Sequence, residues 1–301
     1  MHPSREVEHL RLIIENISKQ YKDKIAVNQF FAELSEGVYA LLGPNGSGKT
    51  TLMRMLAGIL KPTSGRVLLN GQDIAVMDED YRDVLGYLPQ EFGMYHNFTA
   101  ERFFMYFASL KGLDKKQSIK KVSEVLELVN LKQDRKRKTG KFSGGMKRRL
   151  GIAQALLNDP KILIVDEPTA GLDPQERIRF RNLLSEISAD RIVFLSTHIV
   201  SDIEYIAKEI LLMKQGQLIQ QNTLEGLLEQ VKGKVWQATI TQDELSMVQS
   251  KFKLGNIQRT QTGIDLRIVS DEKPFAGATE VPTMLEDVYL YFFEQEIAVN
   301  V

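Results

Sequence analysis

The sequence predicts an α/β fold followed by a small α+β domain, and three observations lead to this prediction. Short apolar runs that suit buried strands alternate with segments whose apolar residues recur at helical spacing. A glycine-rich loop, 43–50, lies between one apolar run and a helix candidate. After about residue 220 the pattern changes to short strand candidates separated by glycines. We therefore expect one domain over residues 1–220 and a smaller one over 221–301.

Each expected element has its own local signal. The apolar runs of the first domain predict strands at 10–17, 39–42, 66–69, 84–88, 162–165 and 192–196. The last two are unbroken runs, which are typical of strands buried on both faces. Apolar residues recur every three or four positions over 118–129 and 175–187, which predicts helices there, and another helix is expected to begin near Lys49. In the second domain, 235–240 and 264–269 are expected to be strands.

Composition excludes several classes of function. Lys and Arg total 39 and Asp and Glu total 39, so the net charge of +0 predicts no nucleic-acid partner. The 301 residues contain no cysteine, which excludes disulfides, cysteine-ligated zinc and a thiol nucleophile. No apolar run approaches the roughly 20 residues of a membrane-spanning helix. Charges interrupt the N-terminal stretch where a signal peptide carries its apolar core, so we expect no signal peptide.

The loop at 43–50 matches the phosphate-binding (Walker A) pattern in full. Its glycines let the backbone curl so that successive N–H groups and a helix N-terminus point at phosphate oxygens. Lys49 would add positive charge at the β- and γ-phosphates, and the Thr50 hydroxyl would ligate Mg²⁺. The sequence therefore predicts a nucleoside triphosphate site built by Gly43, Pro44, Asn45, Gly46, Ser47, Gly48, Lys49, Thr50 and Thr51.

Two acidic residues, Asp166 and Glu167, end the apolar run 162–165, where open α/β sheets place their ligands. Asp166 is expected to hold Mg²⁺, and Glu167 to polarise a water molecule aimed at the γ-phosphate. The alternative is a pair of solvated acids at a strand end. His198 follows the next buried run and would reach the same edge, as a γ-phosphate contact or as a structural histidine.

A further motif identifies the family. The segment Phe142-Ser143-Gly144-Gly145-Met146, followed by a basic, helix-compatible stretch, resembles the signature of ATP-binding cassette (ABC) ATPases. The family's other motifs occur in the family's order, with Gln90 after the phosphate loop, then the signature, the acidic strand, Gly171-Leu172-Asp173 and His198. This resemblance implies a P-loop NTPase cassette: a RecA-like α/β core, an antiparallel β subdomain, and an α-helical signature subdomain over about 91–155.

The resemblance also implies a role for each matching residue. Tyr21 would stack on adenine, although an aromatic at that distance before the loop also suits ordinary packing. Gln90 would touch Mg²⁺ and sense the membrane partner. Glu167 would be the catalytic base and His198 the γ-phosphate contact. Asp173 would contribute to a contact between two subunits.

In this family the signature completes the site of a partner, which is a second copy of the chain or a related ABC ATPase. Ser143 and the N–H groups of Gly144 and Gly145 would close over the partner's ATP. The sequence departs from the common pattern at Phe142, where Leu is usual, and at Met146, where Gln is usual. Neither change removes the serine or the glycine N–H groups, so we expect an active ATPase that uses ATP and Mg²⁺.

Two functions remain open within the family. The first is the ATP-hydrolysing subunit of a membrane transporter, bound at the cytoplasmic face of the membrane to separate permease chains. The second is a soluble ABC ATPase that remodels a nucleic-acid or ribosomal complex. One cassette without a long coiled coil favours the transporter. Residues 282–289 and the signature segment resemble bacterial exporters of drugs, antibiotics or ions, which favours export.

Two segments allow two interpretations each. The aromatic-rich stretch 91–113 suits either permease docking or packing inside the helical subdomain. The stretch 131–149 suits either a solvated helix face or a site near lipid headgroups or the triphosphate. It contains one acidic residue, Asp134, and nine basic residues. The basic residues are Lys132, Arg135, Lys136, Arg137, Lys138, Lys141, Lys147, Arg148 and Arg149.

Overall fold

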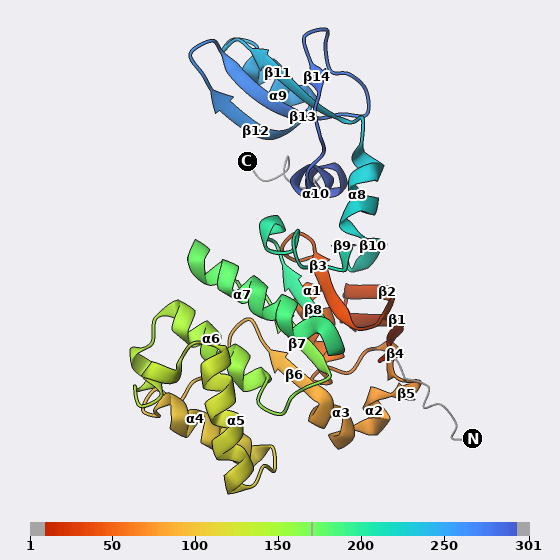
Figure 1. The fold of residues 1–301 in the computed structure, drawn as a ribbon. Coiled ribbons are helices and arrows are strands. Elements are labelled where there is room, and N and C mark those ends of the chain that lie inside the picture. The colour runs from red at the N-terminus through yellow and green to blue at the C-terminus, as the bar shows by residue number, and fades with distance from the viewer. Residues whose placement is uncertain (1–9, 170, 294–301) are drawn as a thin grey trace, which may run out of the picture. The chain divides into compact units, whose positions relative to one another are not determined.

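A computed structural model describes residues 10–169 and 171–293, and the chain divides into two compact units, residues 1–221 and 222–301 (Figure 1). Each unit is described by itself. Residues 1–9, which bear on the expected absence of a signal peptide, lie outside the described residues. Within the described residues, every helix is too short or too polar to span a bilayer.

The first unit is organised around a six-stranded sheet with the order β10-β9-β3-β8-β7-β6. The strands are β3 (Gly37–Leu42), β6 (Leu85–Leu88), β7 (Ile162–Asp166), β8 (Ile192–Thr197), β9 (Glu209–Lys214) and β10 (Gln217–Asn222). From β6 to β9 all neighbours pair in parallel. Every residue of β7 and β8 is buried, as the unbroken apolar runs predict. The helices α1 (Lys49–Leu56) and α7 (Pro174–Ile187) follow β3 and β7 in the chain.

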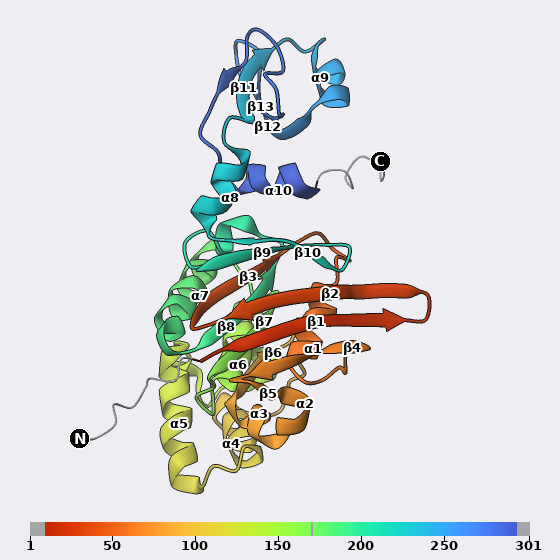
Figure 2. The same ribbon diagram turned by 90° about the vertical axis from the view of Figure 1, so that its right-hand side faces the viewer.

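A second, antiparallel sheet packs against this core, with the order β2-β1-β4-β5. Its strands are β1 (Leu12–Tyr21), β2 (Lys24–Leu34), β4 (Ser64–Leu69) and β5 (Gln72–Asp73). Figure 2 shows β1 and β2 as one long hairpin. Ile14 and Phe30 from this hairpin share a buried cluster with Leu52 of α1 and Phe194 of β8, which joins the two sheets. Two short helices, α2 (Ile74–Met77) and α3 (Glu79–Val84), lead back to β6.

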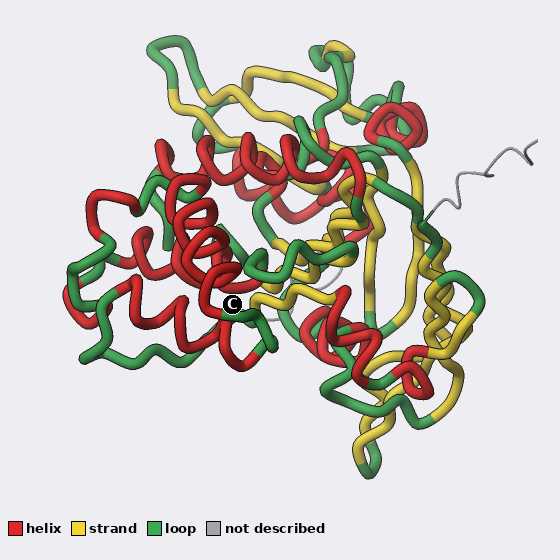
Figure 3. Tube along the Cα trace, turned by 60° about the horizontal axis from the view of Figure 1, so that its bottom comes forward, coloured by secondary structure: helices red, strands yellow, loops and turns green. Residues whose placement is uncertain are grey.

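The helical subdomain lies between β6 and β7 in the chain, and its helices gather apart from the strands (Figures 1 and 3). It contains α4 (Ala100–Leu110), α5 (Lys115–Leu128) and α6 (Gly144–Ala155), with 3₁₀ turns at Lys132–Asp134 and Thr139–Lys141. Its own core includes the fully buried Phe103, Phe104 and Leu150. A capping box between Asp114 and Gln117 fixes the start of α5.

Over residues 222–293, the second unit contains a four-stranded antiparallel sheet, of order β12-β13-β11-β14, and three helices. Its elements are α8 (Leu224–Val231), β11 (Val235–Ile240), α9 (Leu245–Lys251), β12 (Lys253–Arg259), β13 (Ile264–Val269), β14 (Thr279–Glu280) and α10 (Leu285–Phe293). Asp287 of α10 is buried and bonds Arg267 of β13, which ties the last helix to the sheet.

The structure contains strands and helices beyond the expected elements, and the helices α8, α9 and α10 of the second unit are among them. Strand β2 was not expected, because its pattern of apolar residues is irregular. Its pairing with β1 shifts register between Ile14 and Ile17, and again between Ile17 and Lys19. Such bulges break the alternation on which strand prediction depends. Strands β9, β10 and β12 also lie outside the expected set.

Candidate functional site

Three loops that carry the predicted site residues meet at the carboxyl edge of the parallel sheet. The phosphate loop follows β3, Asp166 ends β7, and His198 follows β8. Leu42 pairs with Thr197, and Asp166 pairs with Ser196, so the ends of these strands are adjacent in register. The sheet thus brings together residues that are more than 100 positions apart in the chain.

The phosphate loop is curled so that its last glycine begins α1. Gly48 has φ 106° and is the N-cap of the helix. The Lys49 ammonium lies back over the loop and donates to the carbonyl oxygens of Gly43 at 2.7 Å and Pro44 at 3.1 Å. Burial lowers the pKa of Lys49, although the negative charges of Glu167 and Asp166 oppose this shift. The lysine is therefore a mostly desolvated cation that strengthens any interaction with a phosphate oxygen.

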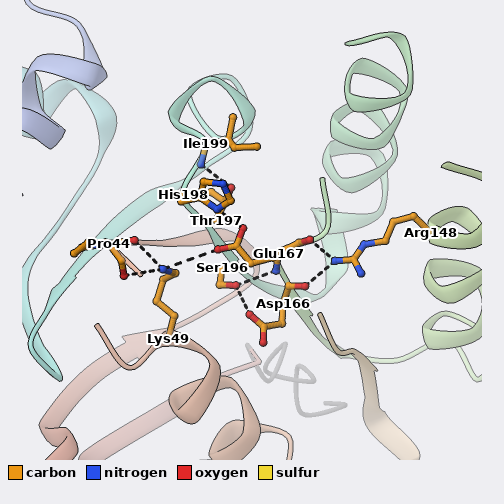
Figure 4. Close-up of polar contacts among 10 residues, drawn as sticks. Pro44, Lys49, Arg148, Asp166, Glu167, Ser196, Thr197, His198 and Ile199 are labelled. Carbon is orange, nitrogen blue, oxygen red and sulfur yellow. Dashed lines mark hydrogen bonds and ion pairs between the residues drawn. The ribbon is translucent and has the colours of Figure 1, made fainter. Parts of the chain in front are cut away.

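The two acids are oriented by β8 (Figure 4). The buried Ser196 hydroxyl donates to Asp166 Oδ1 at 2.5 Å and accepts from the Glu167 N–H at 3.0 Å. Glu167 Oε2 lies 2.8 Å from His198 Nδ1, and Oε1 lies 3.9 Å from Lys49 Nζ. Glu167 also has a positive φ of 48°, a conformation that non-glycine residues rarely adopt. Its carboxylate thus lies between a lysine and a histidine.

Lys49 and Glu167 help to line a cavity of ≈ 330 Å³ at the same edge. The residues that line it are Lys24, Ala26, Asn45, Gly46, Gly48, Lys49, Thr50, Thr51, Gln90 and Glu167. Sequence reasoning missed Lys24 and Ala26, which belong to the unexpected strand β2 and carry no motif. Tyr21 lies outside this lining and is 46% exposed, so its adenine role stays a prediction.

The signature lies elsewhere on the unit. In the described part of the chain, none of its residues lines the cavity; they are Phe142, Ser143, Gly144, Gly145 and Met146. Ser143 caps α6 by accepting from the Met146 N–H at 3.2 Å. Asp173 caps α7 in the same way, accepting from the Glu176 N–H at 2.9 Å. Within one chain, therefore, these two residues act as helix caps and do not line the cavity.

The two ambiguous segments are also placed. In 91–113, Phe103 and Phe104 are fully buried in the helical core, whereas Tyr95 and Tyr106 are 46% and 40% exposed. The stretch thus contributes both to packing and to surface. Within 131–149, Lys132, Arg135 and Arg137 form ion pairs with nearby acids at the surface, as a solvated face would. Arg148 is instead buried.

Comparisons with known proteins agree with this geometry. The ABC transporter family model matches residues 27–170. The chain is 39% identical over 230 residues to the uncharacterized ABC transporter ATP-binding protein YxlF of Bacillus subtilis (strain 168), covering 76% of this chain and 76% of that protein. The chain belongs to the ABC transporter ATP-binding protein family. It is also 38% identical over 209 residues to the bacitracin transport ATP-binding protein BcrA of Bacillus licheniformis, covering 68% of this chain and 67% of that protein.

The solved structures give the same family fold. The dimeric structure of MJ0796, a bacterial ABC transporter cassette, superposes with a TM-score of 0.65 at 25% identity, covering 71% of this chain and 98% of that one. The predicted family, α/β cassette fold and ATPase activity are thus confirmed. The chain is an ATP-binding and ATP-hydrolysing subunit of a transporter, and the relatives favour this function over the soluble alternative.

The residues of this ABC cassette also suit Mg²⁺ beside the triphosphate. Asp166 Oδ2 is buried without a hydrogen-bond partner among the described residues, because Ser196 takes only the other oxygen. Thr50 and Gln90, which carry a hydroxyl and an amide oxygen, also line the cavity. These are oxygen donors of the kind that Mg²⁺ prefers, and the ion would neutralise phosphate charge there.

Proposed function

We propose that this subunit dimerises on ATP, hydrolyses it at the shared interface, and thereby drives a separate permease. One observation carries the proposal. The phosphate loop, Gln90 and Glu167 share one cavity, whereas Ser143 of the same chain lies outside it. A site that lacks its signature needs a second cassette to supply one. The relative whose structure is described as dimeric supports this arrangement.

The proposed roles follow from the contacts. Lys49, desolvated and donating to two carbonyl groups, transfers its N–H donors to the β- and γ-phosphates of ATP. Glu167 accepts a proton from the attacking water, and His198, 2.8 Å from Glu167, bonds the γ-phosphate. Thr50, Gln90 and Asp166 hold Mg²⁺. Tyr21 stacks on adenine, and Asp173 contacts the second subunit.

The proposed permease contact is the surface near Gln90. The rings of Tyr95 and Tyr106 lie edge to face with their centroids 5.4 Å apart, and both side chains are well exposed. Tyr95 lies in the segment that directly follows Gln90. Aromatic residues of this kind are enriched in protein interfaces. The subunit would thus act at the cytoplasmic face of the membrane. The exporter-like signature segment and residues 282–289 support export as its direction.

Glu167→Gln tests the catalytic part of the proposal. Loss of a general base should lower the hydrolysis rate by about 10² to 10⁴-fold while ATP binding persists. With Mg-ATP, this variant should elute from size-exclusion chromatography at twice the monomer mass. Glu186→Gln, an exposed carboxylate on α7, is the matched control and should hydrolyse ATP like the wild type.

Two outcomes would overturn the proposal. Hydrolysis by Glu167→Gln at the wild-type rate would remove Glu167 as the base. A monomer of that variant in saturating Mg-ATP would refute pairing of the chain with itself. Ser143→Arg in the same background should abolish the dimer while the monomer still binds ATP, because the signature closes only over the partner's nucleotide.

A further inference from the structure

Arg148 is a buried arginine on α6 whose contacts the proposed function does not yet use. It lies five residues after the signature serine and is 8% exposed. All five hydrogen bonds that its guanidinium makes with described residues go to main-chain carbonyl oxygens. Burial lowers the pKa of Arg148, but an arginine remains charged in proteins, so the desolvated cation is compensated by these carbonyl dipoles.

The carbonyl groups come from two different loops of the site. Nη1 donates to Gln90 at 2.9 Å and to Pro89 at 3.4 Å, in the loop that follows β6. Nη2 donates to Asp166 at 2.7 Å and also to Glu167, and Nε donates to Pro168 at 2.7 Å, all after β7. One planar group therefore bridges the Gln90 loop and the acidic loop (Figure 4 shows its bonds to Asp166 and Glu167).

Glu167, which accepts one of the Arg148 hydrogen bonds, has a strained backbone conformation. Glu167 has φ 48°, and such a conformation persists only where its surroundings hold it. On one side, the Glu167 N–H donates to the hydroxyl and carbonyl oxygens of Ser196. On the other side, the Glu167 carbonyl accepts from Arg148. The direction of the Glu167 carboxylate thus depends on both β8 and α6.

We propose that Arg148 is a positioning residue, which holds the Glu167 main chain in its strained conformation and couples it to the loop of Gln90. This inference rests on the proposed role of Glu167 as the catalytic base. A planar fork with donors on three nitrogens can satisfy both loops at once, whereas a lysine ammonium concentrates its donors at one point. A shift of the Gln90 loop or of α6 therefore changes the orientation of the base, and hydrolysis follows the position of the helical subdomain.

Arg148→Lys tests the fork while keeping the charge. We expect kcat to fall by about 10 to 100-fold, while KM for ATP stays within about twofold, because Arg148 does not itself line the cavity and contacts the lining residues Gln90 and Glu167 only at their main-chain carbonyl groups. Arg191→Lys is the matched control. Its side chain is 12% exposed and donates to the Pro160 carbonyl, but it lies at the opposite edge of the sheet, beside the start of β8. Its kcat should remain within about twofold of the wild type.

A double-mutant cycle separates positioning from a general structural role. In single-turnover assays, Arg148→Lys should lower the residual hydrolysis of Glu167→Gln by less than about twofold, because the base that it positions is already gone. Equal losses in both backgrounds, or a wild-type kcat for Arg148→Lys, would overturn the inference. Arg148→Gln is the second variant and should show the same pattern in both backgrounds. Hydrolysis rates are divided by the amount of bound ATP, so that a fraction of unfolded protein does not lower them. Wild-type hydrolysis by Glu167→Gln would instead overturn the proposed base.

Discussion

Replacing Asp287 with Ala should destabilise the second unit selectively. Its carboxylate is 1% exposed and accepts from Arg267 Nε at 2.8 Å, from Arg267 Nη2 at 2.7 Å and from the Met284 N–H at 2.7 Å. The hydrogen bond to Asp287 is the main reason that the pKa of Arg267 is raised. Without Asp287, the guanidinium stays largely buried and loses its counter-charge. Breaking a buried pair in this way costs about 3–5 kcal/mol.

That loss is large compared with the free energy of unfolding expected for a unit of this size. At roughly 0.05–0.15 kcal/mol per residue, residues 222–293 have a free energy of unfolding of about 4–11 kcal/mol. The urea slope for a domain of this size is about 1 kcal/mol per M, so the unfolding midpoint should fall by at least about 3 M. In the lower part of the stability range, the unit would already be unfolded without urea.

The chain offers a reporter that is specific for this unit. Its single tryptophan, Trp236, lies on β11, and its indole N–H donates to the Ser270 carbonyl at 3.1 Å. Tryptophan fluorescence during urea unfolding therefore follows the second unit alone. Asp271→Ala is the control, because that carboxylate is 70% exposed in its pair with Lys234 and is worth about 1 kcal/mol or less. If the two variants had the same midpoint, the reasoning from burial would be refuted.

Two further predictions concern the first unit. In Gly48→Ala, a Cβ would lie 2.2 Å from the Ala26 carbonyl oxygen, so calorimetry should show ATP affinity reduced by at least about tenfold. In the control Gly46→Ala, the added Cβ would have no atom within 4 Å, so the loss of ATP affinity should be smaller. Equal ATP affinities for Gly48→Ala and the wild type would contradict the predicted clash. Ser196→Ala removes the hydrogen bond to the buried Asp166 and should lower the free energy of unfolding by about 1–3 kcal/mol, measured by circular dichroism in urea. Ser188→Ala removes a partly exposed hydroxyl that donates to the Ser185 carbonyl oxygen and should change the free energy of unfolding by less than about 0.5 kcal/mol. A similarly small value for Ser196→Ala would contradict the assigned contact.

The sequence predicts the central strands and the motif-bearing residues well, for a local physical reason. Strands β7 and β8 are buried on both faces, so every residue must be apolar until the carboxyl edge, where polar residues begin. Asp166 and His198 are conspicuous because they follow such runs. Parallel pairing then places them together without further information from the sequence.

Other parts of the site depend on contacts that no local pattern encodes. Lys24 and Ala26 reach the cavity from β2, an edge strand whose bulges remove the alternating pattern. Arg148 is one of nine basic residues in a short stretch, and nothing in the spacing distinguishes it from its solvated neighbours. Its burial follows from the packing of α6 beside two loops that are 18 and 58 positions away in sequence.

The cap at the start of α6 bears on how the signature would recognise a nucleotide. A hydroxyl group has a single hydrogen and two lone pairs. Because the Ser143 oxygen accepts from the Met146 N–H, one lone pair is directed into the helix, and the hydrogen remains available on the exposed side. The same bond makes that hydrogen a better donor through cooperative polarisation. The Ser143 hydroxyl is therefore oriented to donate a hydrogen bond to an anion before a partner subunit binds.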